Sequence, residues 1–192
     1  MSIMITHAKR ERFNCKDAIY HIVTRCNNKE SLIKNELDFI KYKFIIKKCK
    51  EKYGFLLYDY AIMNNHVHLL IKLFTVINIS QIMHSIDRWY ARWYNEHYVR
   101  NGHFWEDRFY GELIKDDLQL LAVMRYIDLN SVKAGLCKDP SEWLHSGARF
   151  YLKGMKDALL DTPEIYTSLG DTERARQKTY SFIFPSNLTR LE

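Results

Sequence analysis

Two histidines separated by one residue lie in the apolar stretch YAIMNNHVHLLIKL, residues 60–73. Side chains alternate along a strand, so His66 and His68 would share one face. Neutral imidazole binds divalent metals well, and such a pair could therefore hold one ion. On these residues alone a structural role is the alternative, with one ring at the solvent end of the strand and the other hydrogen-bonded in the core. A metal site would also need a third protein ligand.

A second pair of chemically competent residues lies in LLAVMRYIDLNSVKAG. Tyr126 and Asn130 are four residues apart, so on a helix both side chains project from one face. A tyrosine hydroxyl can act as a nucleophile, and an amide oxygen can bind a hard cation. On spacing alone, packing by Tyr126 and a helix end at Asn130 are the commoner explanation.

The composition sets limits on the class of protein. The chain has 192 residues, of which 47% are hydrophobic and 27% charged, and this favours one packed domain with or without an extension. A net charge of +6 favours a polyanionic partner, nucleic acid first. The four cysteines form no CxxC pair, which suits reduced thiols in a cytoplasmic protein. We expect no membrane span, because no apolar run reaches the required length, and no signal peptide.

Periodicity and turn residues predict the elements that position these residues. The predicted strands are 18–26, 55–63, 66–74 and 108–115, and the predicted helices are 35–54, 78–102 and 116–135. The order β-α-β-β-α-β-α predicts a ferredoxin-like (RRM-like) α+β fold. Its antiparallel sheet carries helices on one face, and a C-terminal helix carries Tyr126.

Finer features of the helices and the chain end are also predicted. The apolar face of helix 35–54 is expected at Leu37, Ile40, Phe44 and Ile45, and Ser80 is a candidate N-cap of the next helix. Residues 1–154 are predicted to form the main domain, with 139–154 as a short docked segment. Residues 155–192 would be a loosely packed extension, in which YSFIF could form a strand.

Five stretches of this chain together resemble the REP-associated tyrosine transposases, within the single-tyrosine HUH transposases. They are YHIVTRCNNKE, YAIMNNHVHLLIK, NGHFWEDRF, MRYIDLNSVKAG and DPSEWLHSGARFYLKG, and they cover roughly residues 12–154 in the family's order. His66-Val67-His68 matches the His-hydrophobe-His motif. The chain departs from the family pattern at Asn64 and Ser131, where proline is usual, and at Asp107, where glycine is usual.

The resemblance implies a function for both pairs of residues. His66, His68 and Asn130 would hold Mg²⁺ or Mn²⁺, and Tyr126 would attack a phosphate of single-stranded DNA. The products would be a 5′-phosphotyrosine link and a free 3′-OH, which permits strand transfer. The partner would be single-stranded or hairpin DNA of a repeated extragenic palindrome. The protein would be a nucleoid-associated monomer or homodimer.

Basic, amide and aromatic side chains near these stretches are candidate DNA contacts. The candidates are Arg25, Asn27, Arg88, Arg92, Trp105, Arg108 and Lys133. On helix 78–102, Ile82, Ile86 and Trp89 are expected instead to face the core. Two other functions stay open: a non-catalytic single-stranded nucleic-acid-binding protein, and a metal phosphoesterase using water, for which Tyr126 would be dispensable.

Overall fold

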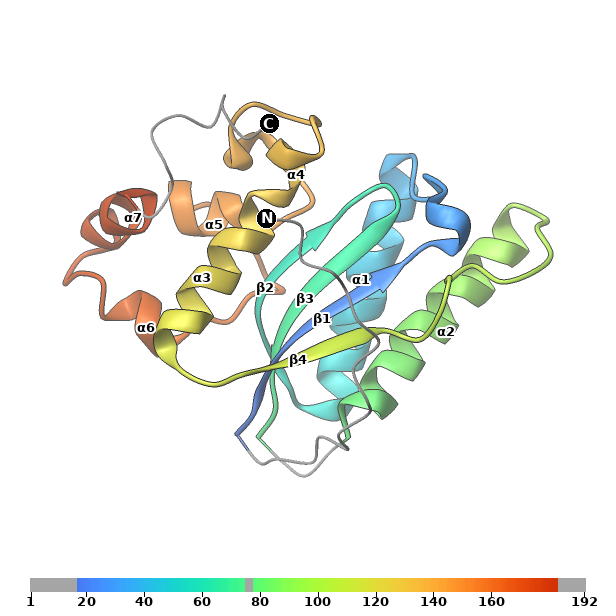
Figure 1. Ribbon diagram of the computed structural model, residues 1–192, viewed down its shortest axis with the longest axis horizontal. Coiled ribbons are helices and arrows are strands. Elements are labelled where there is room, and N and C mark those ends of the chain that lie inside the picture. The colour runs from blue at the N-terminus through green and yellow to red at the C-terminus, as the bar shows by residue number, and fades with distance from the viewer. Residues whose placement is uncertain (1–16, 75–77, 183–192) are drawn as a thin grey trace.

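The computed structural model describes residues 17–74 and 78–182 and contains one four-stranded antiparallel sheet with helices on both faces (Figure 1). The strands are β1 (Ile19–Arg25), β2 (Leu56–Ile62), β3 (His66–Lys72) and β4 (Tyr110–Ile114). They lie in the order β2-β3-β1-β4. The predicted α+β class, its antiparallel sheet and the order of its elements are confirmed.

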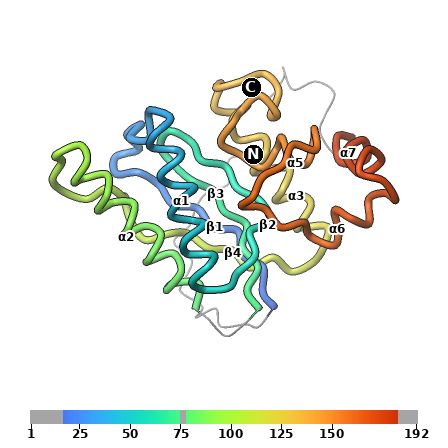
Figure 2. Tube along the Cα trace, turned by 180° about the vertical axis from the view of Figure 1, so that it is seen from behind, coloured from blue at the N-terminus to red at the C-terminus, as the bar shows by residue number. Residues whose placement is uncertain are grey.

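Two long helices, α1 (Glu36–Tyr53) and α2 (Ile79–His97), cover one face of the sheet. The short helix η1 (Asn27–Lys29) follows β1. On the other face lie α3 (Asp117–Asp128), α5 (Ala148–Lys153), α6 (Glu164–Thr167) and α7 (Glu173–Phe182). Between α3 and α5 come α4 (Asn130–Lys133) and η2 (Pro140–Glu142). The reverse view separates the two layers (Figure 2). No helix within the described ranges has the length and apolar character that a membrane crossing requires.

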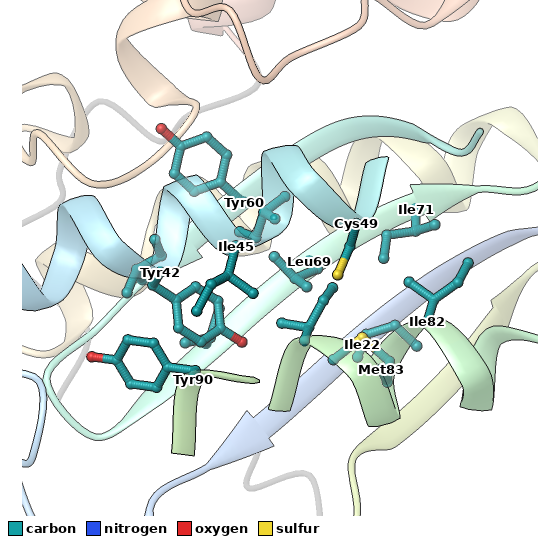
Figure 3. Packing of buried hydrophobic residues seen from close by; sticks show 14 of the residues in the cluster. Ile22, Tyr42, Ile45, Cys49, Tyr60, Leu69, Ile71, Ile82, Met83 and Tyr90 are labelled. Atoms are coloured by element: carbon teal, nitrogen blue, oxygen red, sulfur yellow. The ribbon is translucent and has the colours of Figure 1, made fainter. Parts of the chain in front are cut away.

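Strand alternation divides the core into two clusters. Val67 and Leu69 of β3 are fully buried against α1 and α2, in the cluster that Figure 3 shows around Leu69. Leu70 points the other way and joins Met124 and Ile127 of α3 in a second cluster. Because β3 is buried on both faces, its apolar residues fix the position of α3 relative to the sheet.

Helix α1 begins at a capping box, in which Asn35 and Asp38 satisfy each other's backbone N–H groups, and ends at Gly54 in the left-handed conformation. Its predicted apolar face is wrong at three of four positions. Leu37, Ile40 and Phe44 are about half exposed, whereas Ile45 is buried as expected. The buried stripe instead contains Phe39, Tyr42, Ile45, Ile46 and Cys49.

Helix α2 follows its predicted face more closely. Ile82 and Ile86 are fully buried, but the core position expected for Trp89 is wrong, since this side chain is 39% exposed. The N-cap is Asn78, whose side chain accepts a hydrogen bond from the backbone of Ser80, and not Ser80 itself.

The C-terminal helices pack into the second cluster through single tyrosines. Tyr166 of α6 and Tyr180 of α7 are buried there, and the Tyr180 hydroxyl donates to Asp128 Oδ2 at 2.8 Å. A strand at YSFIF is wrong for residues 180–182, which are helical, and its last two residues lie outside the described ranges. The division of the chain at residue 154 stays a prediction.

Two carboxyl groups are buried where α3 meets β2. Asp59 and Asp128 are fully inaccessible to solvent. Burial raises the pKa of Asp128 to about 7, although the Tyr180 hydroxyl opposes this shift. Burial, reinforced by the charge of Asp128, raises the pKa of Asp59 well above its ordinary value. Ionising either group in this apolar site is costly, so the folded protein holds protons that the unfolded chain releases.

The raised pKa of Asp128 predicts how the stability of the fold depends on pH. Protonated Asp128 contributes its full stabilisation of the folded state below about pH 4. This contribution is lost as the pH rises through about 7, because the carboxyl of the unfolded chain ionises first. Asp128→Asn keeps the shape without the charge, so we expect it to be more stable than the wild type at pH 8, by on the order of 2 kcal/mol. Near pH 4 the two proteins should be similar. Chemical denaturation at both pH values measures this, and an Asn variant that is destabilised equally at both would contradict it.

Candidate functional site

His66 and His68 lie on the face of β3 that meets α3, and their ring centroids are 5.0 Å apart. His66 Nδ1 lies 2.6 Å from Oδ1 of Asn65, in the turn between β2 and β3. His68 Nδ1 lies 3.0 Å from Nε2 of His21, on β1. Both rings therefore use Nδ1 to bind protein. Nε2 of His68 is buried and has no hydrogen-bond partner among the described residues.

The environment keeps all three imidazoles neutral. Burial lowers the pKa of His21 and of His66 to about 4, and the charge of Arg25 adds to the effect on His66. Burial, then the neighbouring histidines and Arg25, lowers the pKa of His68 well below its ordinary value. A neutral imidazole keeps a lone pair on one nitrogen, which a cation can accept.

Tyr126 faces this cluster from α3. Its half-buried ring stands edge-on to His68, with centroids 5.5 Å apart, and to His21 at 5.8 Å. The buried Met124 and Ile127 of α3 hold the helix against the sheet, which directs Tyr126 toward the histidines. Nζ of Lys133 lies 4.6 Å from the centroid of the Tyr126 ring, within cation–π range.

Asn130 follows the end of α3 and is mostly buried, with 8% of its surface exposed. Its Nδ2 donates to the backbone carbonyl of Tyr126 at 2.7 Å. Within the described residues no hydrogen bond reaches its Oδ1. The amide is thus held beside Tyr126 with its oxygen available to a ligand.

These groups fit a divalent cation that accepts nitrogen and oxygen ligands. The buried, unpartnered Nε2 of His68 supplies one lone pair, and the side-chain oxygen of Asn130 supplies another. In the part of the chain that the structure describes, no three His, Cys, Asp or Glu side chains form a metal cluster. A cation here would therefore use the histidines with an amide, and Mg²⁺ or Mn²⁺ suits such a set better than a thiolate-seeking ion.

Two of the predicted DNA contacts lie beside this cluster. Arg25 pairs with His66 in the β1–β3 register, and its charge acts on both His66 and His68. Lys133 lies over Tyr126. Asn27 is farther along, in η1, where its backbone N–H donates to the Phe104 carbonyl.

Three of the remaining predicted DNA contacts lie on the face of the sheet away from the histidines. Arg88 and Arg92 are exposed on α2, which covers the opposite face of the sheet, and Arg92 pairs with Glu96 at 2.7 Å. Trp105 also packs there, and its indole N–H donates to the Asp87 carbonyl at 2.9 Å. Arg108 is exposed just before β4. As DNA contacts these residues stay predictions.

Sequence reasoning missed His21. The available signal was its place in AIYHIVTRC, where Tyr20 and Ile22 are the buried apolar positions and His21 takes the other face. Alternation alone places His21 on that face, but only the pairing of β1 with β3 shows that His68 lies beside His21.

Known proteins resemble this chain in sequence pattern and in fold. A family model described as "Transposase IS200 like" matches residues 14–130. A solved structure of a REP-associated tyrosine transposase bound to a REP hairpin superposes with a TM-score of 0.65 at 18% identity, over 81% of this chain and 92% of that one. A protein from Deinococcus radiodurans R1, assigned as a transposase, gives a TM-score of 0.46 at 17% identity, over 63% and 96%. No curated protein matches. The first likeness shows a shared fold.

Proposed function

We propose that this chain, which belongs to the family of IS200-like transposases, cleaves single-stranded DNA and transfers the strand through a covalent link to Tyr126. The observation that carries the proposal is the position of Tyr126 beside the paired histidines, with His68 5.5 Å away ring to ring. The buried Nε2 of His68, which meets no partner among the described residues, and the hydroxyl of Tyr126 suit the binding of one reacting phosphate at this cluster.

His66, His68 and Asn130 would hold Mg²⁺ or Mn²⁺ in this proposal. When bound, such an ion supplies Lewis-acid polarisation of a non-bridging phosphate oxygen. The protein's own contribution is to keep the imidazoles neutral by burial, and to hold the Asn130 amide through the Tyr126 carbonyl.

The chemical step uses Tyr126 Oη as the nucleophile. A bond forms between Oη and phosphorus while the P–O3′ bond breaks, so the 5′ phosphate becomes linked to the protein and the 3′ oxygen leaves and takes up a proton. The phenol loses its proton during attack. The cationic Nζ of Lys133 over the ring stabilises the negative charge that develops there. In the reverse sense a DNA 3′-OH attacks the phosphotyrosine, and the phenoxide leaves, which conserves the bond energy for strand transfer.

The substrate we propose is single-stranded DNA beside a hairpin. The net charge of +6 supports a nucleic-acid partner. The structurally similar REP-associated transposase was solved with a REP hairpin, which supports a hairpin-containing repeat as the substrate here. Arg25 and Lys133 are the phosphate contacts that the geometry favours, because both lie at the histidine–tyrosine cluster.

Replacing the nucleophile tests the proposal. Hairpin DNA with a single-stranded flank, labelled at its 3′ end, should form a denaturant-resistant adduct with the wild type in Mn²⁺, because the 3′ fragment stays on Tyr126. Tyr126→Phe should abolish both adduct and cleavage while DNA binding persists. Cleavage that survives Tyr126→Phe would indicate a water-using phosphoesterase. Binding by the wild type with neither cleavage nor adduct would indicate a non-catalytic module. Either result overturns the proposal.

Lys133 gives a second, graded test. Lys133→Met should slow cleavage at saturating DNA by about tenfold, or about 1.4 kcal/mol, because the cation that stabilises the negative charge developing on Tyr126 in the transition state is lost. Lys133→Arg keeps the cation and should retain most of the rate. DNA affinity is measured for both variants, which separates an effect on Tyr126 from loss of a phosphate contact. A Met variant that cleaves at the wild-type rate when saturated with DNA would contradict this role.

A further inference from the structure

His21 is a buried histidine that the chemistry above does not use. It lies 47 residues before His68 in the chain, yet its Nε2 is 3.0 Å from Nδ1 of His68. The two rings lie edge to edge, with centroids 5.2 Å apart and planes 13° from parallel, as an in-plane hydrogen bond requires. Only 5% of His21 and 3% of His68 is exposed.

A hydrogen bond between two neutral imidazoles requires one donor and one acceptor. Either His68 Nδ1 carries the proton and His21 Nε2 accepts, or the roles are reversed. The choice decides the state of His68 Nε2, which then has a lone pair in the first case and an N–H in the second.

The surroundings of Nε2 favour the lone pair. This atom is buried and meets no acceptor among the described residues, and orphaned buried N–H groups are rarer than unsatisfied acceptors. The positive charges of Arg25 and Lys133 act on His68. Positive charge nearby disfavours a further N–H and favours a lone pair.

We propose that His21 is a positioning residue, which accepts a hydrogen bond from Nδ1–H of His68 and thereby keeps His68 in the tautomer whose Nε2 can bind a cation. Partners on the far nitrogen commonly fix the tautomer and orientation of a metal-binding imidazole. In the same way, Asn65 Oδ1 would accept a hydrogen bond from Nδ1–H of His66. The consequence for cation binding rests on the proposed function, whereas the tautomer does not.

Two variants separate the hydrogen bond from the packing of the ring. His21→Phe keeps an aromatic ring against His68 but removes the acceptor. His21→Gln removes the ring and keeps an acceptor oxygen within reach of Nδ1. If His21 only fills space, Phe is the milder change. If His21 acts as a hydrogen-bond acceptor, His21→Gln is the milder change.

Long-range ¹H–¹⁵N NMR of histidine-labelled protein, without metal or DNA, reads the tautomer of each ring directly. His68 is assigned by comparison with a His68→Asn variant, and the resonance of His145, whose ring stacks on Phe39 of α1, reports whether each variant is folded. We expect the Nδ1–H form of His68 in the wild type and in His21→Gln, and the Nε2–H form in His21→Phe. An Nε2–H form in the wild type, or no change in His21→Phe, would overturn the proposal.

Cation affinity gives the second readout, from the electron paramagnetic resonance of free Mn²⁺ in a titration of each protein. His21→Phe should weaken Mn²⁺ binding by about tenfold or more, and His21→Gln by less. Unchanged affinity in His21→Phe would refute the positioning role. A wild type that binds no Mn²⁺, with or without hairpin DNA, counts against the proposed function, and the tautomer measurement still decides the part played by His21.

Discussion

The antiparallel register between β1 and β3 is the constraint on which both faces of the sheet depend. It sets Arg25 opposite His66 and Val23 opposite His68, so that His21 and Arg25 of β1 share the α3 face with both histidines of β3. The intervening Val67 and Leu69 are fully buried under α1 and α2. A slip of one residue would turn the histidines into that apolar core and expose the aliphatic side chains to α3. Packing on one face therefore specifies the chemistry on the other.

The face that carries the histidines buries several polar groups under α3. Near Tyr126 the helix meets the neutral pair of His21 and His68, and two residues later Asp128 enters a buried contact with Tyr180. Such contacts stabilise only when their members stay neutral or paired, and unpaired buried charge is costly. Their geometry is directional, so they fix the rotation of α3 more tightly than apolar packing would. Helix α7 thus acts on the placement of Tyr126 from the far end of the chain.

The sequence predicted the parts of the fold that alternation and turn residues specify. The four strands and the turn at Asn64 and Asn65 follow from period-two patterning, and this sheet is what the structure contains. The prediction of the apolar face of α1 was wrong because two stripes of apolar residues on this helix fit a period of 3.6, one through Phe44 and one through Tyr42. The structure buries the second. The exposed Phe44 is tolerated because Lys41 and Lys48 lie over its ring, at 5.3 and 5.8 Å. Periodicity does not distinguish these stripes, since the choice depends on how the helix meets the sheet.

The candidate site was predictable in proportion to how local its contacts are. The spacing of His66 and His68 was enough to place them on one face, whereas His21 reaches His68 only through strand pairing. Tyr126 and Asn130 were expected on one continuous helix, yet α3 ends at Asp128 and α4 starts at Asn130. The spacing of one turn survives because Leu129 between them keeps helical backbone angles, φ −76° and ψ −8°. The Asn130 side chain donates back to the Tyr126 carbonyl. A side chain bonded in this way has its nitrogen committed to the backbone, and this leaves the oxygen as the only amide atom that can serve a cation. The hydrogen bond to the Tyr126 carbonyl therefore orients the amide.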